Sequence, residues 1–198
     1  DLVNPLCDYD IQRLNQAFEM MGRGETIGVF QVEGGGMQSM LRGMRPTKSE
    51  HTIAGVSMYR PGPMEFIPDY NDYLHERKEL HYKHPKLEPI LKETFSIIVY
   101  QEQIMQIAGE LFGYELGEAD QIRKAVSKKR DKELLQHRET FVTRGPENGV
   151  DKEAANLIFD DIMYFANYGF NKAHATDYAV ITVQSAFLKC HYAAEFMT

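Results

Sequence analysis

The chain has 198 residues, of which 43% are hydrophobic, and this apolar content is sufficient for a buried core. Its formal net charge of −7 argues against a protein that coats nucleic acid without specificity. No apolar run is long enough to cross a membrane, and the first residues lack the pattern of a signal peptide. The two cysteines, Cys7 and Cys190, fit a reducing compartment, with a disulfide between them as the alternative. We therefore expect a cytoplasmic protein.

The apolar residues recur mainly with helical spacing, so the sequence predicts a mainly α fold of many helices. Helices are predicted over residues 8–21, 37–44, 49–58, 87–92, 101–111, 120–129, 131–143, 152–165 and 176–196. Asp120 and Asp151 are the expected N-caps of the helices that follow them.

Three segments between these helices are predicted to be non-helical. Residues 28–32 should form a short strand or extended segment, and the Pro-Gly-Pro sequence at 61–63 should fix a rigid loop. Residues 69–89 are polar and are expected to form an exposed connection. The chain begins with Asp1 rather than Met and stops at Thr198 inside a predicted helix. We therefore expect it to be a fragment of a longer protein.

The strongest local charge lies between residues 122 and 132, where six basic residues and one acidic residue give a local charge of +5. The basic residues are Arg123, Lys124, Lys128, Lys129, Arg130 and Lys132. Like charges at helical spacing repel each other, and a bound phosphate would turn this repulsion into attraction. Arginine can hold a phosphate through two donors, and a helix N-terminus near Asp120 would add backbone donors. The alternative is an ordinary solvated basic surface.

Two shorter motifs also carry polar groups that could meet a ligand. Residues 168–174 combine Asn171, Lys172 and His174 in a turn that opens a helix, and the alternative is a plain helix-to-helix turn with a buried aromatic residue. Residues 100–103 begin another helix, where they could serve either as a cap or as part of a site.

Other kinds of site are not indicated. His75, His81 and His84 could bind a metal, but their spacing is not specific and no cysteine lies near them. The Gly34–Gly36 run lacks the Lys-Ser/Thr pair of a phosphate-binding loop, and no serine lies in a nucleophile elbow. We therefore expect neither a metal ligand nor a catalytic residue in this chain.

Six segments together resemble the alpha subunit of bacterial DNA polymerase III, the C-family of replicative DNA polymerases. They are residues 28–37 (GVFQVEGGGM), 59–64 (YRPGPM), 99–103 (VYQEQ), 119–129 (ADQIRKAVSKK), 168–174 (YGFNKAH) and 188–197 (LKCHYAAEFM). The segments follow the order and spacing of the family and cover essentially the whole chain.

The resemblance implies that residues 1–198 are the fingers region, and that the palm, PHP and C-terminal domains lie outside this chain. It implies a DNA-directed DNA polymerase, a nucleotidyltransferase of DNA replication, whose catalytic aspartates and Mg²⁺ belong to the palm. The fragment alone should therefore be inactive. The implied partners are an incoming deoxynucleoside triphosphate (dNTP), primer-template DNA, the rest of the alpha subunit and, through it, the replisome, with no membrane.

The resemblance also assigns roles to individual residues. Contact with the triphosphate of the dNTP is implied for Arg123, Lys124, Lys128, Asn171, Lys172 and His174. Contact with the DNA backbone, or support of the site, is expected of Lys129, Arg130, Arg60, Gln101 and Gln103.

Three positions depart from the family pattern. Lys124 replaces the usual second arginine and keeps the charge without the planar fork, Ser127 replaces a common glycine, and Asp177 adds an acid near His174. These departures leave open a catalytically inactive nucleic-acid-binding or partner-binding module with the same fold. A further alternative is an all-α interaction domain.

Overall fold

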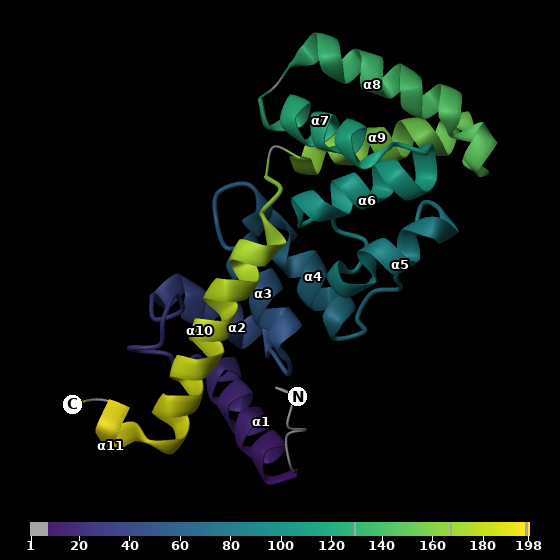
Figure 1. The fold of residues 1–198 in the computed structure, drawn as a ribbon. Helices are drawn as coiled ribbons and strands as arrows, with labels where there is room; N and C mark the ends of the chain where they lie inside the picture. The colour runs from purple at the N-terminus through teal and green to yellow at the C-terminus, as the bar shows by residue number, and fades with distance from the viewer. Residues whose placement is uncertain (1–7, 129, 167, 197) are drawn as a thin grey trace. The chain divides into compact units, whose positions relative to one another are not determined.

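The computed structural model describes residues 8–128, 130–166, 168–196 and 198 (Figure 1). Their α-helices are α1 (Asp8–Gly22), α2 (Gly35–Met44), α3 (Ser49–Met58), α4 (Ile67–Leu74), α5 (Glu88–Leu91), α6 (Gln101–Phe112), α7 (Leu116–Ser127), α8 (Asp131–Arg144), α9 (Lys152–Ala166), α10 (Lys172–His191) and α11 (Ala193–Phe196). Short 3₁₀ helices are η1 (Pro63–Phe66), η2 (Pro85–Leu87), η3 (Lys92–Thr94) and η4 (Pro146–Asn148). The described residues form no β-strand, so the predicted mainly α fold is confirmed. Within these ranges, no helix is both long and apolar enough to cross a membrane.

The chain divides into two compact units, and each is described by itself. Unit 1 comprises residues 1–71 and 173–198, and unit 2 comprises residues 72–172. Unit 1 contains α1 to α3, nearly all of α10, and α11, whereas unit 2 contains α5 to α9.

In unit 1, α2 packs against both α1 and α3. The approach of α3 to α2 depends on Gly55, because a Cβ there would lie 3.1 Å from Met40 Cε and 3.3 Å from Met44 Sδ. Both methionines are buried, so a larger residue at position 55 would require their side chains to shift.

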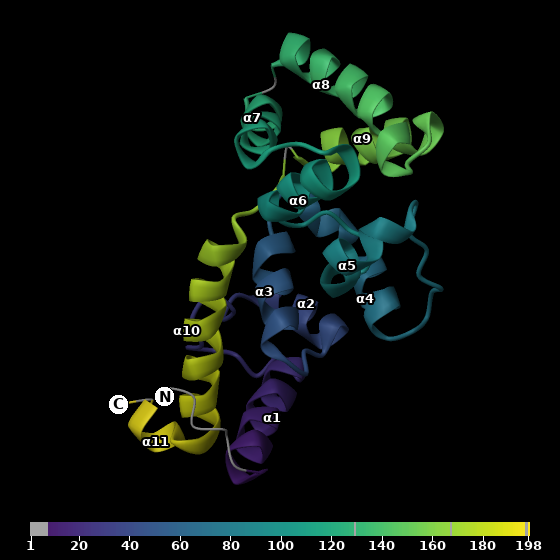
Figure 2. The ribbon, with the colours of Figure 1, turned by 45° about the vertical axis from the view of Figure 1, so that its right-hand side comes forward.

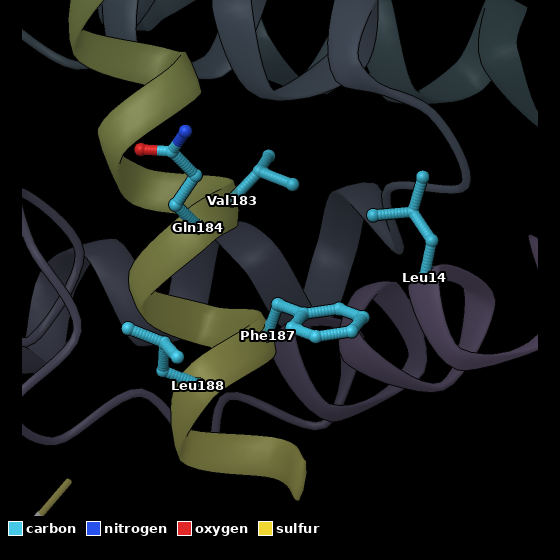
Figure 3. Close-up of a pocket in the computed structure, with 5 residues that line it drawn as sticks. All are labelled: Leu14, Val183, Gln184, Phe187 and Leu188. Carbon is cyan, nitrogen blue, oxygen red and sulfur yellow. The ribbon is translucent and has the colours of Figure 1, made fainter. Parts of the chain in front are cut away.

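The helices α1 and α10 of unit 1 border an open apolar groove. It has a volume of about 460 Å³ and is lined by Leu14, Val183, Gln184, Phe187 and Leu188. In Figure 3, Val183 and Phe187 extend from α10 toward the side on which Leu14 of α1 lies.

The core of unit 2 is built from stacked aromatic rings and aliphatic residues. The rings of Phe112 and Phe141 stack with centroids 3.8 Å apart, and Phe159 meets Phe141 edge-on at 5.1 Å. These three side chains come from α6, α8 and α9, so they join the three helices. Helix α8 lies along α9, and α7 packs against α6 and α8 (Figure 2).

Several predicted boundaries agree with the structure. The helix predicted over residues 49–58 is α3, and the helix predicted over 101–111 is α6. Helix α6 ends at Phe112 and is capped by Gly113 in a left-handed conformation (φ 63°). The N-cap prediction at Asp151 is confirmed, because its carboxylate accepts the backbone N–H of Ala154 at 2.8 Å.

The prediction of a strand or extended segment at residues 28–32 was wrong. The segment forms successive turns, with positive φ at Gly28 (78°) and Gln31 (65°). Val29 and Val32 are both fully buried although they are three residues apart, and Thr26 Oγ1 donates to Val32 O at 2.6 Å. The buried valines therefore reflect a tight turn rather than a pleated strand.

The prediction that Asp120 is an N-cap was also wrong, because α7 begins four residues earlier, at Leu116. Its first turn is supported by Glu118, whose carboxylate accepts the backbone N–H of Glu115 at 2.9 Å. Asp120 lies inside the helix, where its carboxylate is available to side chains farther along α7.

Two further boundaries differ from the predictions. The connection predicted over 69–89 contains most of α4 at its start. The last helix, predicted over 176–196, begins at Lys172 and ends at His191, and α11 follows it. The earlier start is explained by Glu102, whose carboxylate accepts the backbone N–H of Lys172 at 3.0 Å and so supplies a cap from another helix.

Candidate functional site

The two cations with the most specific predicted role, Arg123 and Lys124, both contact Asp120 on α7. Asp120 Oδ1 accepts from Arg123 Nε at 2.8 Å and lies 2.6 Å from Arg123 Nη2. Asp120 Oδ2 lies 2.6 Å from Lys124 Nζ. Lys124 and Arg123 hold the pKa of the Asp120 carboxyl below its usual value, because both stabilise its charged form. The repulsion expected between the two cations is therefore offset by an acid of the same helix.

The basic residues Lys128, Arg130 and Lys132, which follow α7, are also exposed. Arg130 pairs with Glu133 through an Nη1–Oε1 distance of 2.9 Å. Lys129 lies outside the described residues. Exposed positive charge therefore lies at Lys124, Lys128, Arg130 and Lys132 and, in part, at Arg123.

Gln101 connects α7, the basic helix that carries Arg123 and Lys124, to the turn at residues 168–172. Its side-chain Oε1 accepts from Arg123 Nη1 at 3.3 Å, and its Nε2 donates to Gly169 O at 3.1 Å. Its backbone N–H donates to Phe170 O at 2.9 Å, and the Phe170 N–H donates to Val99 O at 3.0 Å. The structure thus brings Arg123, Gln101 and the turn together within unit 2.

Lys172 is fixed at the start of α10 by two acids. Its Nζ donates to both Glu93 carboxylate oxygens at 2.7 Å and lies 5.3 Å above the centroid of the Tyr100 ring. A phosphate would have to share this ammonium with Glu93. The neighbouring Asn171 is exposed.

Gln103 occupies a supporting position. Its side chain is 2% exposed, and its Oε1 accepts the backbone N–H groups of Val99 at 2.9 Å and Tyr100 at 3.0 Å. Its Nε2 donates to Thr94 Oγ1 at 2.8 Å. Gln103 therefore fixes the backbone from which Gln101 extends.

Arg60 and His174 lie in unit 1. Arg60 Nε donates to Ser57 O at 2.8 Å, and burial lowers the pKa of the Arg60 guanidinium. His174 is exposed, and its ring centroid lies 4.3 Å from that of Tyr178 on the same helix.

The acids that pair with Arg123, Lys124 and Lys172 were not predicted from the sequence. Asp120 precedes Arg123 by three residues and Lys124 by four, so helical spacing could have identified both ion pairs. Glu93 is 79 residues from Lys172, and no local pattern predicts that contact.

The predicted metal candidates do not come together. Across the described ranges, no group of three or more His, Cys, Asp or Glu residues could hold a metal ion. His84 instead accepts the backbone N–H of Lys86 through Nδ1 at 3.2 Å, at the start of η2.

Arg123, Gln101 and the turn at 168–172 thus lie together on a frame of helices, and comparison with known proteins gives the family. A family model described as the bacterial DNA polymerase III alpha subunit finger domain matches residues 8–149. The chain belongs to this family.

The chain is also similar to curated DNA polymerase III alpha subunits. It is 51% identical to that of Thermus aquaticus over 96% of this chain, and 50% identical to that of Halalkalibacterium halodurans over 92%. It is 45% identical to that of Bacillus subtilis over 92% of this chain. The chain spans 16–17% of the length of these three relatives.

Proposed function

We propose that this chain is the fingers region of a DNA-directed DNA polymerase of replication and that its basic helix binds the triphosphate of the incoming dNTP. The proposal is carried by the arrangement of Arg123 and Lys124, which share Asp120 on one helix and are joined through Gln101 to the turn at 168–172. Membership of the polymerase III alpha family supplies the reaction class.

The proposed role of the two cations is to stabilise the charge that develops on the pyrophosphate leaving group. Cations that are fixed before the reaction stabilise this charge without reorganising, which lowers the barrier. Because Lys124 is 56% exposed, a phosphate can reach its ammonium and replace Asp120 as its partner. Mg²⁺ held by palm aspartates outside this chain would supply the metal chemistry.

Other residues have secondary roles in the proposal. Lys128 completes the triphosphate contacts together with Asn171 and Lys172, and Lys172 also holds the turn. The DNA backbone is contacted through Lys129, Arg130 and Arg60, with a sequence-independent and salt-dependent contribution. The whole polymerase would act in the cytoplasm with primer-template DNA and the other replisome components.

The test is steady-state nucleotide incorporation by the full-length polymerase carrying Arg123→Ala and Lys124→Ala together. The catalytic efficiency for the dNTP should fall by about 10-fold or more, which corresponds to about 1.4 kcal/mol, while the affinity for primer-template DNA is unchanged. A loss of DNA affinity with unchanged nucleotide efficiency would instead make the helix a backbone-binding surface. No change in either quantity would make it a solvated surface.

A further inference from the structure

We propose that Gln101 is a positioning residue, which holds the Arg123 guanidinium beside the turn at 168–172 and thereby prepares it for the nucleotide. The inference rests on the proposed function, because Arg123 is the central cation of that site. It assigns to Gln101 an action through Arg123 rather than a contact with the DNA backbone.

Three hydrogen bonds of Gln101 carry the argument. Its backbone N–H donates to Phe170 O at 2.9 Å, and its amide Nε2 donates to Gly169 O at 3.1 Å. Its amide Oε1 accepts from Arg123 Nη1 at 3.3 Å. An amide presents a donor on one side and an acceptor on the other, and a guanidinium can only donate. The carbonyl of Gly169 therefore orients the amide so that its oxygen faces Arg123.

The turn fits closely against Gln101. A Cβ at Gly169 would lie 3.1 Å from Gln101 Cγ, which is tighter than ordinary packing. The next residue of α6, Glu102, accepts the backbone N–H of Lys172. The first two residues of α6 thus both bind the turn that orients the amide.

Arg123 is consequently held from two directions. Asp120 binds its Nε and Nη2 from the same helix, and Gln101 binds its Nη1 from α6. An arginine side chain loses rotational freedom when it binds a phosphate, and part of this cost is removed when its guanidinium is already held in place. Loss of the Gln101 amide should therefore weaken nucleotide binding even though the charge of the site is unchanged.

The test uses the full-length polymerase with Gln101→Met, which keeps the side-chain length and removes the amide. The KM for the dNTP should rise about 5-fold with kcat changed by less than about 2-fold, because the Arg123 guanidinium is then less well held in place before the nucleotide binds. The affinity for primer-template DNA should be unchanged. Gln106→Met is the matched control, since Gln106 is an exposed residue of the same helix. Gln101→Asn, which keeps the amide but shortens its reach, should raise the KM in the same direction.

The decisive comparison is made in the Arg123→Ala background. If Gln101 acts through Arg123, adding Gln101→Met to Arg123→Ala produces no further rise in KM. The inference would be overturned if Gln101→Met raised the KM equally in the wild type and in the Arg123→Ala variant. It would also be overturned if Arg123→Ala raised the KM but neither Gln101 variant did. If Arg123→Ala itself leaves the KM unchanged, the proposed function fails, and this outcome is distinguishable from failure of the inference alone.

Discussion

Replacement of the buried Gln103 by Met tests how the site is supported. Met matches the length of Gln, but it cannot accept the backbone N–H groups of Val99 and Tyr100, which are 5% and 2% exposed. A buried donor left without an acceptor costs about 1–3 kcal/mol, so the two donors together predict a loss of about 2–6 kcal/mol in the free energy of unfolding. The new thioether packs in the space of the amide and offsets little of this loss.

The loss would be measured by urea unfolding, followed by the helical circular dichroism signal. Gln106→Met changes the same residue type at an exposed position of α6 and should shift the unfolding free energy by less than about 0.5 kcal/mol. A similarly small shift for Gln103→Met would refute the conclusion that this amide supports the backbone of the site.

Three further predictions concern other parts of unit 2. Gly145→Ala should destabilise the chain by about 1–3 kcal/mol, because the added Cβ would lie 2.8 Å from Val150 O and 2.9 Å from Phe141 O. Gly117→Ala is the control, since there is open space around Gly117, and it should be neutral or stabilising in the same unfolding assay. The Arg144 guanidinium holds the pKa of Glu118 below its usual value of 4.5, so this pair stabilises the fold above that pH and stops doing so as the pH falls through the lowered pKa. The difference in stability between the wild type and Glu118→Gln should therefore shrink in acid, and a constant difference across that range would contradict the assignment. Arg130→Ala in the full-length polymerase should weaken binding to all primer-template sequences alike and reduce the slope of log affinity against log salt by about one, whereas an unchanged slope would show that Arg130 contacts no DNA phosphate.

The helical elements were largely predictable because their signals are local. Helix α6 has an apolar stripe at helical spacing and a glycine at its end, and Gly113 adopts the left-handed conformation that such an end requires. Residues 28–32 were not predictable by the same means. Their buried valines resemble those of a strand, but the turn is fixed by contacts such as that from Thr26 to Val32, which only the folded chain displays.

The residues of the candidate site were predictable from the sequence, but the contacts that join them were not. The basic residues of α7 and the motif at 168–174 were identified from the sequence, and their link through Gln101 was not. Arg123 lies 22 residues from Gln101, and Gly169 lies 68 residues from it, so neither contact follows from local spacing. The pairing of Lys172 with Glu93 depends on tertiary structure in the same way.

The most direct test of the central claim is the equilibrium dissociation constant of the next correct dNTP. It would be measured with the full-length polymerase on a primer-template whose primer end cannot be extended. We predict that Arg123→Ala together with Lys124→Ala weakens this binding by about 10-fold or more, or about 1.4 kcal/mol, with the affinity for the primer-template itself unchanged. An unchanged dissociation constant for the dNTP would contradict the assignment of the basic helix to the triphosphate.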